Sequence, residues 1–391
     1  MNNNWEKLMI IISRVRSLTL IGTADITASG IAAIFWFYMA SLLGTEQYGQ
    51  VSYFLSIVSI ASTVSLFGFE NTISVYVAKK VRVEPAIYII SIVSGVVTGI
   101  VLYLMFNHIG ISVYVLGAII FGLASAEIIA NGLYKSYSKY LITHKILMVV
   151  LSIGFYHALG VDGIFLGIGI AFFPYLIRVF KGFKNATPNF SLLRARSHFI
   201  LNSYFLNLSS VFNGSIDKLI IGPLVGFALL GNYQLGIQFL SVLHILPSIV
   251  YKYTLPQDAG GNPNKKLKKA TILSSVGLAI FGITLSPIIV PAFFPQYNEA
   301  IQVIQIVSLS IIPTTINLMF TSKFLAAEKN RIILISSGIH LSVLVTSLIL
   351  LGRMYGINGM AAALVLAIST ESVYYYIINR HEKSFQNFST N

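Results

Sequence analysis

The composition of this 391-residue chain excludes a water-soluble globule. Its residues are 55% apolar and 10% charged, with a mean hydropathy of +0.79, so there is too little polar surface to cover a folded domain in water. Cysteine is absent, which excludes disulfides, thiolate nucleophiles and cysteine metal sites. The net charge of +13 would suggest nucleic acid as the partner of a soluble protein, but in a membrane protein it marks topology, and no nucleic-acid partner is expected.

Twelve long apolar segments follow one another along the chain. In lipid every backbone amide needs an internal partner, and these segments lack the two-residue alternation of a barrel strand, so the predicted class is an all-α integral membrane protein. The predicted helices cover residues 18–42, 48–78, 86–106, 112–134, 143–160, 163–180, 199–222, 229–253, 269–293, 298–322, 331–352 and 356–379.

The basic residues predict the orientation of these helices. With the N-terminus in the cytoplasm, the segments on the inner side collect 24 of the 26 Lys and Arg residues, and only Lys218 and Arg353 lie on the outer side. One missing helix would invert every later loop and destroy this bias. We therefore predict twelve transmembrane helices with both termini in the cytoplasm, in a multi-pass protein of the cell inner (cytoplasmic) membrane.

An internal repeat divides the predicted helices into two sets of six. Residues 42–59 match residues 224–241 at a shift of 182, which aligns Gly44 with Gly226 and Gly49 with Gly231, and GVDG at 160–163 matches GING at 356–359 at a shift of 196. Both halves start on the inner side, so the repeats are parallel. The predicted lobes are residues 1–180 with helices 1–6 and residues 181–391 with helices 7–12, arranged around a central cavity.

Polar side chains recur at helical spacing inside the second, seventh and eighth predicted helices. A stripe of hydroxyls and amides is costly against lipid but not against a wet cavity. The predicted cavity-lining residues are Ser52, Ser56, Ser59, Thr63, Ser203, Asn207, Ser210, Asp217, Gln234, Gln238, Ser241 and Ser248. The alternative for each Ser or Thr is that a small residue simply lets two helices pack closely.

Four carboxylates lie at a similar depth within the predicted membrane span. Asp25, Glu70, Glu127 and Glu371 are each eight or nine residues from a cation at the inner end of a helix, which is about 12–14 Å along a helix axis. Acidic groups at such depth are neutral, paired or part of an ion route. Asp25, Glu127 and Glu371 are the ion-coupling candidates, and the alternative for Glu127 and Glu371 is an ion pair that joins two helices.

The remaining charged candidates lie toward the inner side. The polar stripes of the second and eighth helices end at Glu70 and Lys252, which are repeat partners at the shift of 182 and are predicted to form an inner gate. No phosphate-binding loop, H-E-x-x-H motif or G-x-S-x-G motif occurs in the sequence. No enzymatic activity, metal or cofactor is therefore expected, and energy is expected to come from a proton or sodium gradient or from the substrate gradient itself.

Three segments resemble the polysaccharide transporter family of the multidrug/oligosaccharidyl-lipid/polysaccharide flippase superfamily, and within it the Wzx-type O-antigen flippases. They are WFYMASLLGTEQYGQVSYFLSIVSIASTVSLFGFENTISVYVAKK at 36–80, IDKLIIGPLVGFALLGNYQLGIQFLSVL at 216–243 and FLAAEKNRIIL at 324–334. The resemblance implies a flippase that moves a polyprenyl-pyrophosphate-linked oligosaccharide, the O-antigen repeat unit of lipopolysaccharide biosynthesis, from the cytoplasmic to the periplasmic leaflet by alternating access.

Such a substrate needs cations and hydrogen-bonding groups along its route. Lys252 and Lys323 are the candidates for pyrophosphate contact at the inner mouth, while the stripes could exchange hydrogen bonds with sugars. The expected partners are the lipid-linked oligosaccharide, membrane lipids, and polysaccharide polymerase and chain-length regulator proteins. The alternatives are a cation-coupled drug or metabolite exporter of the toxin-extrusion branch and a membrane glycosyltransferase, although the latter needs large outer loops that this chain lacks.

Overall fold

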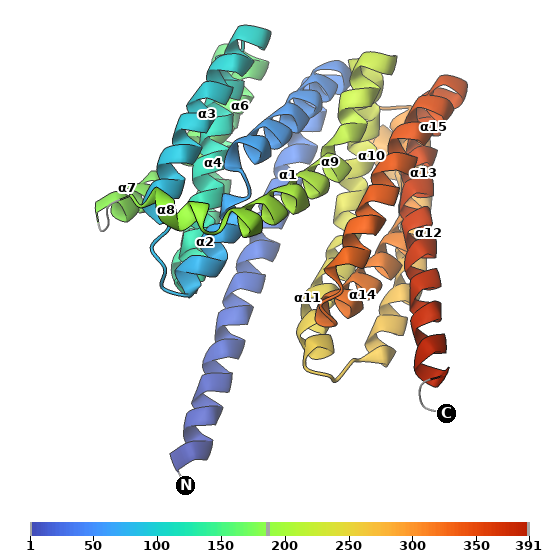
Figure 1. The fold of residues 1–391 in the computed structure, drawn as a ribbon. Helices are drawn as coiled ribbons and strands as arrows, with labels where there is room; N and C mark the ends of the chain where they lie inside the picture. The colour runs from blue at the N-terminus through green and yellow to red at the C-terminus, as the bar shows by residue number, and fades with distance from the viewer. Residues whose placement is uncertain (1, 185–187, 389–391) are drawn as a thin grey trace. The chain divides into compact units, whose positions relative to one another are not determined.

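A computed structural model describes residues 2–184 and 188–388 of the chain, and in this part every regular element is helical (Figure 1). The side chains of Lys7, Arg14, Arg16, Lys184 and Lys383 lie outside the description. The first elements are α1 (Asn2–Leu66), α2 (Phe69–Ala78), α3 (Glu84–Phe106), α4 (Ile109–Ala130), α5 (Tyr134–Leu159), α6 (Val161–Ala171), the 3₁₀ turn η1 (Phe173–Tyr175), α7 (Leu176–Lys184) and α8 (Phe190–Arg194). They are followed by α9 (Ser197–Val225), α10 (Phe227–Leu243), α11 (Ile245–Ala259), α12 (Lys265–Phe293), α13 (Ala300–Ser308), α14 (Ile311–Ala326) and α15 (Asn330–Phe388).

Eight helices in the described part are long and apolar enough to cross a membrane, or nine if the bent pair α10 and α11 counts as one span. Two of the eight are far longer than one crossing needs: residues 22–66 and 330–381 span 45 and 52 residues, against about 20 for a bilayer. Each contains one glycine outside helical geometry, Gly44 (φ 71°) and Gly356 (φ 58°). Each of these helices is therefore two helical limbs joined at a glycine.

Four predicted helices are interrupted in the structure, and one of them, 163–180, divides into α6, η1 and α7. The segment 48–78 breaks at Phe67 and Gly68, which both have positive φ, and a Cβ on Gly68 would lie 2.5 Å from the backbone nitrogen of Tyr204 in α9. The segment 229–253 bends by 45° between α10 and α11, and the segment 298–322 divides into α13 and α14. Pro247 and Pro313 stand at the third residue of α11 and α14, where a missing N–H costs little.

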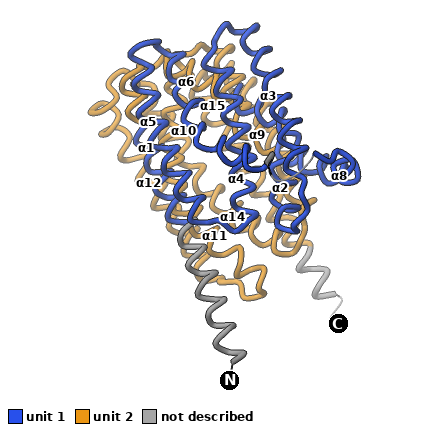
Figure 2. Tube along the Cα trace, turned by 90° about the vertical axis from the view of Figure 1, so that its left-hand side faces the viewer, with its two compact units in different colours: residues 1–35, 57–208 blue, residues 36–56, 209–391 orange. Residues whose placement is uncertain are grey.

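The chain forms two compact units, coloured separately in Figure 2. Unit 1 comprises residues 1–35 and 57–208, and unit 2 comprises residues 36–56 and 209–391. In unit 1, glycines of α6 bring backbones together: the Cα of Gly167 packs against Ser152 of α5, and that of Gly169 against Tyr114 of α4. Small residues at such crossings allow the close packing on which helix association in membranes depends.

The core of unit 2 is built mainly from α9, α10, α13 and α15, and includes the fully buried Leu230, Tyr233, Val307 and Leu348. Residues 36–56 pack into the same unit. The Tyr297 hydroxyl donates to the Ala40 carbonyl at 2.7 Å, and Phe37 meets Phe239 with ring centroids 5.1 Å apart. Ser336 on the first limb of α15 bonds to Glu371 on the second, so these limbs lie side by side.

Both sequence repeats reappear as matched backbone geometry. Gly160 and Gly356, 196 residues apart, have φ/ψ of 62°/−144° and 58°/−139°. A Cβ on the glycine three positions later would overlap the carbonyl oxygen of Phe155 in the first copy and of Leu351 in the second, again 196 residues apart. At the shift of 182, Gly44 and Gly226 both have positive φ. The aligned glycines are thus equivalent turning points of the chain.

Candidate functional site

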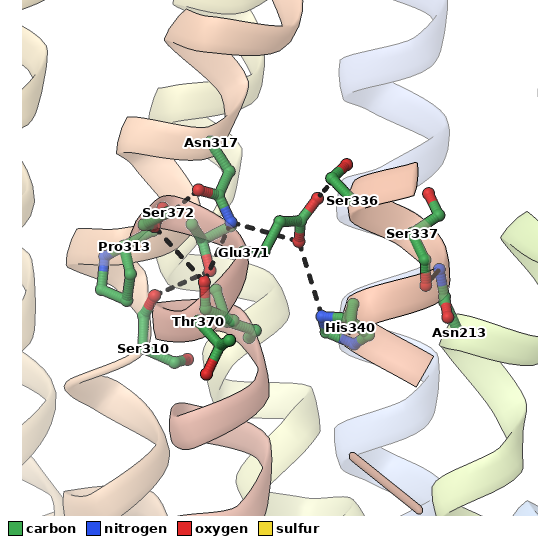
Figure 3. A network of polar contacts seen from close by, with 12 residues as sticks. Asn213, Ser310, Pro313, Asn317, Ser336, Ser337, His340, Thr370, Glu371 and Ser372 are labelled. Atoms are coloured by element: carbon green, nitrogen blue, oxygen red, sulfur yellow. Dashed lines mark hydrogen bonds and ion pairs between the residues drawn. The ribbon is translucent and has the colours of Figure 1, made fainter. Parts of the chain in front are cut away.

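A buried polar network within unit 2 surrounds Glu371 (Figure 3). It is built by α14 and both limbs of α15, because the turn at Gly356 folds the second limb back along the first. Asn317 comes from α14, Ser336 and His340 from the first limb, and Glu371 from the second. The side chain of Glu371 is only 18% exposed and that of His340 10%.

The Glu371 carboxylate receives hydrogen bonds from two sides. The Asn317 amide donates to Oε2 at 3.2 Å and also to the Ile368 carbonyl at 3.1 Å. The Ser336 hydroxyl lies 3.2 Å from Oε1 and 2.6 Å from the Tyr375 hydroxyl. The Ser372 hydroxyl donates to Oδ1 of Asn317 at 2.5 Å, and this bond holds the Asn317 amide in place. A carboxylate fixed from both sides in this way has one defined position.

The imidazole of His340 faces the same carboxylate. Its Nδ1 lies 3.5 Å from Oε2 of Glu371, yet among the described groups no hydrogen bond is made at this nitrogen. A buried polar atom without a partner is uncommon and calls for a specific reason, such as a proton or an ion that comes and goes. Histidine is the side chain whose charge changes most readily near neutral pH. The network thus brings a carboxylate and an imidazole together among packed helices.

The repeat supplies an internal comparison for this network. At the shift of 196, His340 corresponds to His144 in unit 1, Asn317 to Phe121 and Glu371 to Tyr175. His144 is also buried, but it stacks on Phe172 with ring centroids 4.2 Å apart, and Phe121 and Tyr175 complete an aromatic surround. The histidine is thus shared by both units, while the other two positions are Asn and Glu in unit 2 and Phe and Tyr in unit 1.

The other two predicted ion-coupling residues lie in unit 1. In unit 1, Oδ1 of Asp25 accepts a hydrogen bond from the Tyr137 hydroxyl at 3.1 Å, which joins α1 to α5. The buried Glu127 accepts one from Tyr88 of α3 at 2.7 Å. Glu70 lies against the Cα of Gly122 in α4. Glu371 alone among the predicted carboxylates has a histidine 3.5 Å from it in the described part of the chain.

Many hydroxyls of the predicted stripes bond within their own helix. Ser52 donates to the Tyr48 carbonyl at 2.8 Å, Ser56 to Ser52 at 3.0 Å and Thr63 to Ser59 at 2.9 Å, and Ser241 and Ser248 make the same type of bond. Hydroxyls paired in this way are tolerated on packed faces as well as wet ones. Ser203 is buried, Ser210 exposed, and Asn207 accepts from Asn71 at 3.1 Å.

The amides and cations of the predicted site are spread over unit 2. Gln238 is buried, and Oε1 of Gln234 has no hydrogen-bond partner among the described groups. Lys323 donates to Oδ1 of Asn379 at 2.5 Å, while Lys252 is exposed. The central cavity lined by the polar stripes, and the pairing of Glu70 with Lys252, stay predictions.

Asp217 is a structural anchor within unit 2. Its carboxylate lies 3.0 Å from the Lys218 ammonium and accepts a hydrogen bond from the buried Tyr233 hydroxyl at 2.9 Å. Asp217→Ala would remove the carboxylate that the half-buried Lys218 ammonium and the buried Tyr233 hydroxyl both contact, so we expect a loss of about 3 kcal/mol of stability. Tyr233→Phe removes only one hydrogen bond and should cost about half as much or less. Thermal unfolding of the purified variants measures which substitution lowers the melting temperature more. Melting temperatures of both variants equal to that of the parent would contradict a stabilising role for Asp217.

Sequence reasoning missed His340, Asn317, Ser336 and Tyr375. The repeat at a shift of 196, seen in the GVDG and GING segments, also aligns His340 with His144. This alignment is the sequence signal that points to His340. The tertiary structure was needed to show that His340 and Asn317 meet Glu371.

A family model and a curated relative match this chain. A family model described as polysaccharide biosynthesis protein matches residues 15–132. An uncharacterized membrane protein of Methanocaldococcus jannaschii is 25% identical over 92% of this chain and 96% of its own length.

Two solved structures share the fold. The lipid II flippase MurJ in an inward closed conformation superposes with a TM-score of 0.78, 13% identity, and coverage of 93% of this chain and 87% of that one. An inward-facing multidrug resistance MATE transporter of the MOP superfamily superposes with a TM-score of 0.67 and 13% identity. The match covers 93% of this chain and 96% of that one. The chain therefore shares the all-helical fold of these two proteins.

Proposed function

We propose that this protein is a flippase that moves a polyprenyl-pyrophosphate-linked oligosaccharide from the cytoplasmic to the periplasmic leaflet of the inner membrane. The observation that carries the proposal is the likeness to a lipid II flippase over 93% of the chain. The polysaccharide biosynthesis model over residues 15–132 supports a saccharide cargo. The O-antigen repeat unit of lipopolysaccharide biosynthesis is the proposed cargo, and the polysaccharide polymerase and chain-length regulator proteins are the proposed partners.

The proposed topology has twelve spans and cytoplasmic termini. It counts each limb on either side of Gly44 and Gly356 as one crossing, α10 with α11 as one, and α9 as one. The distribution of Lys and Arg supports it, because this count leaves only Lys218 and Arg353 on the outer side. The two six-helix lobes would then alternate access to a substrate path between them.

The proposed energy source is a proton gradient acting at Glu371 and His340. A carboxylate and an imidazole 3.5 Å apart provide two titratable groups, and a change in their protonation alters hydrogen bonds to α14 and to both limbs of α15. The other titratable group in this network is Tyr375, which bonds to Ser336. Proton release would thereby change the packing of three helical segments at once.

His340→Gln tests this coupling with a matched control in the same chain. Glutamine retains a hydrogen-bonding side chain but cannot titrate, so the transport rate should lose at least part of its dependence on pH. His144→Gln, at the repeat-equivalent position among aromatic rings, should keep the pH dependence of the parent. The measurement is transport into proteoliposomes at a series of pH values. The coupling site is rejected if both variants keep the parent profile or both lose it.

The function itself is tested in a deletion strain and in a reconstituted membrane. Without the protein, complete lipid-linked oligosaccharide should accumulate on the cytoplasmic leaflet. In proteoliposomes, the same lipid should become accessible to a membrane-impermeant lectin only when the protein is present. Unchanged surface polysaccharide in the deletion strain, together with no gain of lectin access, would exclude the flippase.

A second candidate function is a cation-coupled exporter of drugs or metabolites. The fold likeness to MATE transporters favours it. In that case deletion would leave surface polysaccharide intact and sensitise cells to cationic drugs, so one strain distinguishes the two functions.

A further inference from the structure

A cavity of about 330 Å³ opens at one end of unit 2, where α10, α13 and the turn of α15 meet. It is lined by Leu229, Glu299, Gln302, Tyr355, Gly356, Ile357 and Asn358. Its size falls at the small end of ligand pockets. None of these residues belongs to the Glu371 network.

The cavity lies at the end of unit 2 that is opposite to its basic loops. The first limb of α15 begins next to Lys329 and Arg331 and runs from Asn330 to the turn at Gly356, about 39 Å of helix, which is enough to cross a bilayer. In Figure 1 the loop between α11 and α12 lies at the other end of the unit from this turn. With the predicted topology, the cavity faces the outer side.

The lining has the chemistry of a sugar-binding surface. Two side-chain amides and one carboxylate offer donors and acceptors to neighbouring hydroxyls, and Tyr355, which is 62% exposed, offers an aromatic face for the apolar side of a sugar ring. The lining holds no Lys, Arg or His, so it does not suit an anion. It holds one carboxylate, and the described part of the chain shows no cluster of three metal-ligating side chains.

The two amides of the lining contact each other. Asn358 donates to Oε1 of Gln302 at 2.6 Å, which holds both side chains in position. Oδ1 of Asn358 is buried and makes no hydrogen bond to any described group. Preorganised polar groups of this kind lower the entropic cost of binding.

The repeat shows how this arrangement differs from its counterpart. At the shift of 196, Asn358 corresponds to Asp162 in unit 1, which caps α4 by accepting from the Gly110 backbone nitrogen at 3.0 Å. In unit 2 the start of α13 is capped instead by Asn232, which accepts from the Ala300 nitrogen at 3.0 Å. The Asn358 amide is thereby free of the capping role and pairs with Gln302 at the cavity.

We propose that this cavity is a carbohydrate-binding subsite, formed by Tyr355, Glu299, Gln302 and Asn358, that takes a sugar of the cargo on the outer side. The inference rests on the proposed function for the identity of the cargo, but sugar binding can be measured separately. Tyr355 stacks on the ring, and the carboxylate and amides receive its hydroxyls. The subsite would favour the cargo that has already crossed.

The test is saturation-transfer NMR on the full chain in lipid nanodiscs. The probes are the methyl glycosides of glucose, galactose, mannose and N-acetylglucosamine. At least one should receive saturation from the parent protein, and Tyr355→Ala should weaken its binding about tenfold or more, which corresponds to about 1.4 kcal/mol. Glu299→Gln should weaken it less, and Tyr355→Phe should retain it.

Tyr253→Ala is the matched control, because Tyr253 is similarly exposed at 58% but lies on α11 away from the cavity. No saturation of any glycoside, or an equal loss in Tyr253→Ala and Tyr355→Ala, would overturn the subsite. If glycosides bind as expected while the protein gives no lectin access in proteoliposomes, the subsite stands and the flippase function fails. If flipping occurs without glycoside binding, the flippase function stands and the subsite fails.

Discussion

Glu371→Gln is expected to reduce gradient-driven transport by about 5–150-fold, the usual range of a coupling free energy between two sites. Glutamine has nearly the same shape as glutamate and can still bond to Asn317 and Ser336, but it cannot release a proton. The protein should therefore remain folded while transport ceases to respond to the gradient. The measurement is transport in proteoliposomes with and without an imposed pH gradient.

Two further variants separate coupling from a general effect of charge. Glu371→Asp keeps the ionisable group and should retain part of the gradient response. Glu46→Gln removes an exposed carboxylate elsewhere in the chain and should behave as the parent. Transport by Glu371→Gln with an unchanged response to the gradient would show that the network does not couple transport to protons.

Gly49→Ala and Gly231→Ala are each expected to destabilise unit 2. A Cβ on Gly49 would overlap the Phe227 carbonyl oxygen, and a Cβ on Gly231 would overlap that of Thr45. Gly49 and Gly231, and likewise Thr45 and Phe227, are 182 residues apart. The two helices thus cross symmetrically at the repeated glycines. Because backbone atoms cannot move away as a flexible side chain can, each substitution should cost about 1–3 kcal/mol.

Gly277→Ala is the matched control for this crossing. Gly277 is exposed on α12, and a Cβ there would meet no atom within 4 Å, so alanine should leave stability unchanged or raise it by about 0.5–1 kcal/mol. Thermal unfolding of the purified proteins compares the three variants. Melting temperatures for Gly49→Ala and Gly231→Ala equal to that of Gly277→Ala would refute the close crossing.

Local sequence patterns predicted the helical class and the turning points of the chain. Long apolar runs leave no alternative to helices in lipid, and aligned glycines such as Gly160 and Gly356 mark equivalent backbone turns because positive φ favours glycine. Helix breaks were harder to foresee. The break at Gly68 depends on the approach of Tyr204 in α9, a contact between residues far apart in the sequence.

The candidate site shows the same division. The sequence by itself determined that Glu371 is a carboxylate within an apolar segment, which is costly unless it has a partner or a role. Only the tertiary structure decided which partners it has, since His340 and Asn317 reach it through the fold of α15 and the packing of α14. The physical reason is that the apolar residues around Glu371 in the sequence already show that its charge is costly in lipid. The groups that contact its carboxylate come from other segments, and only the fold brings them within reach.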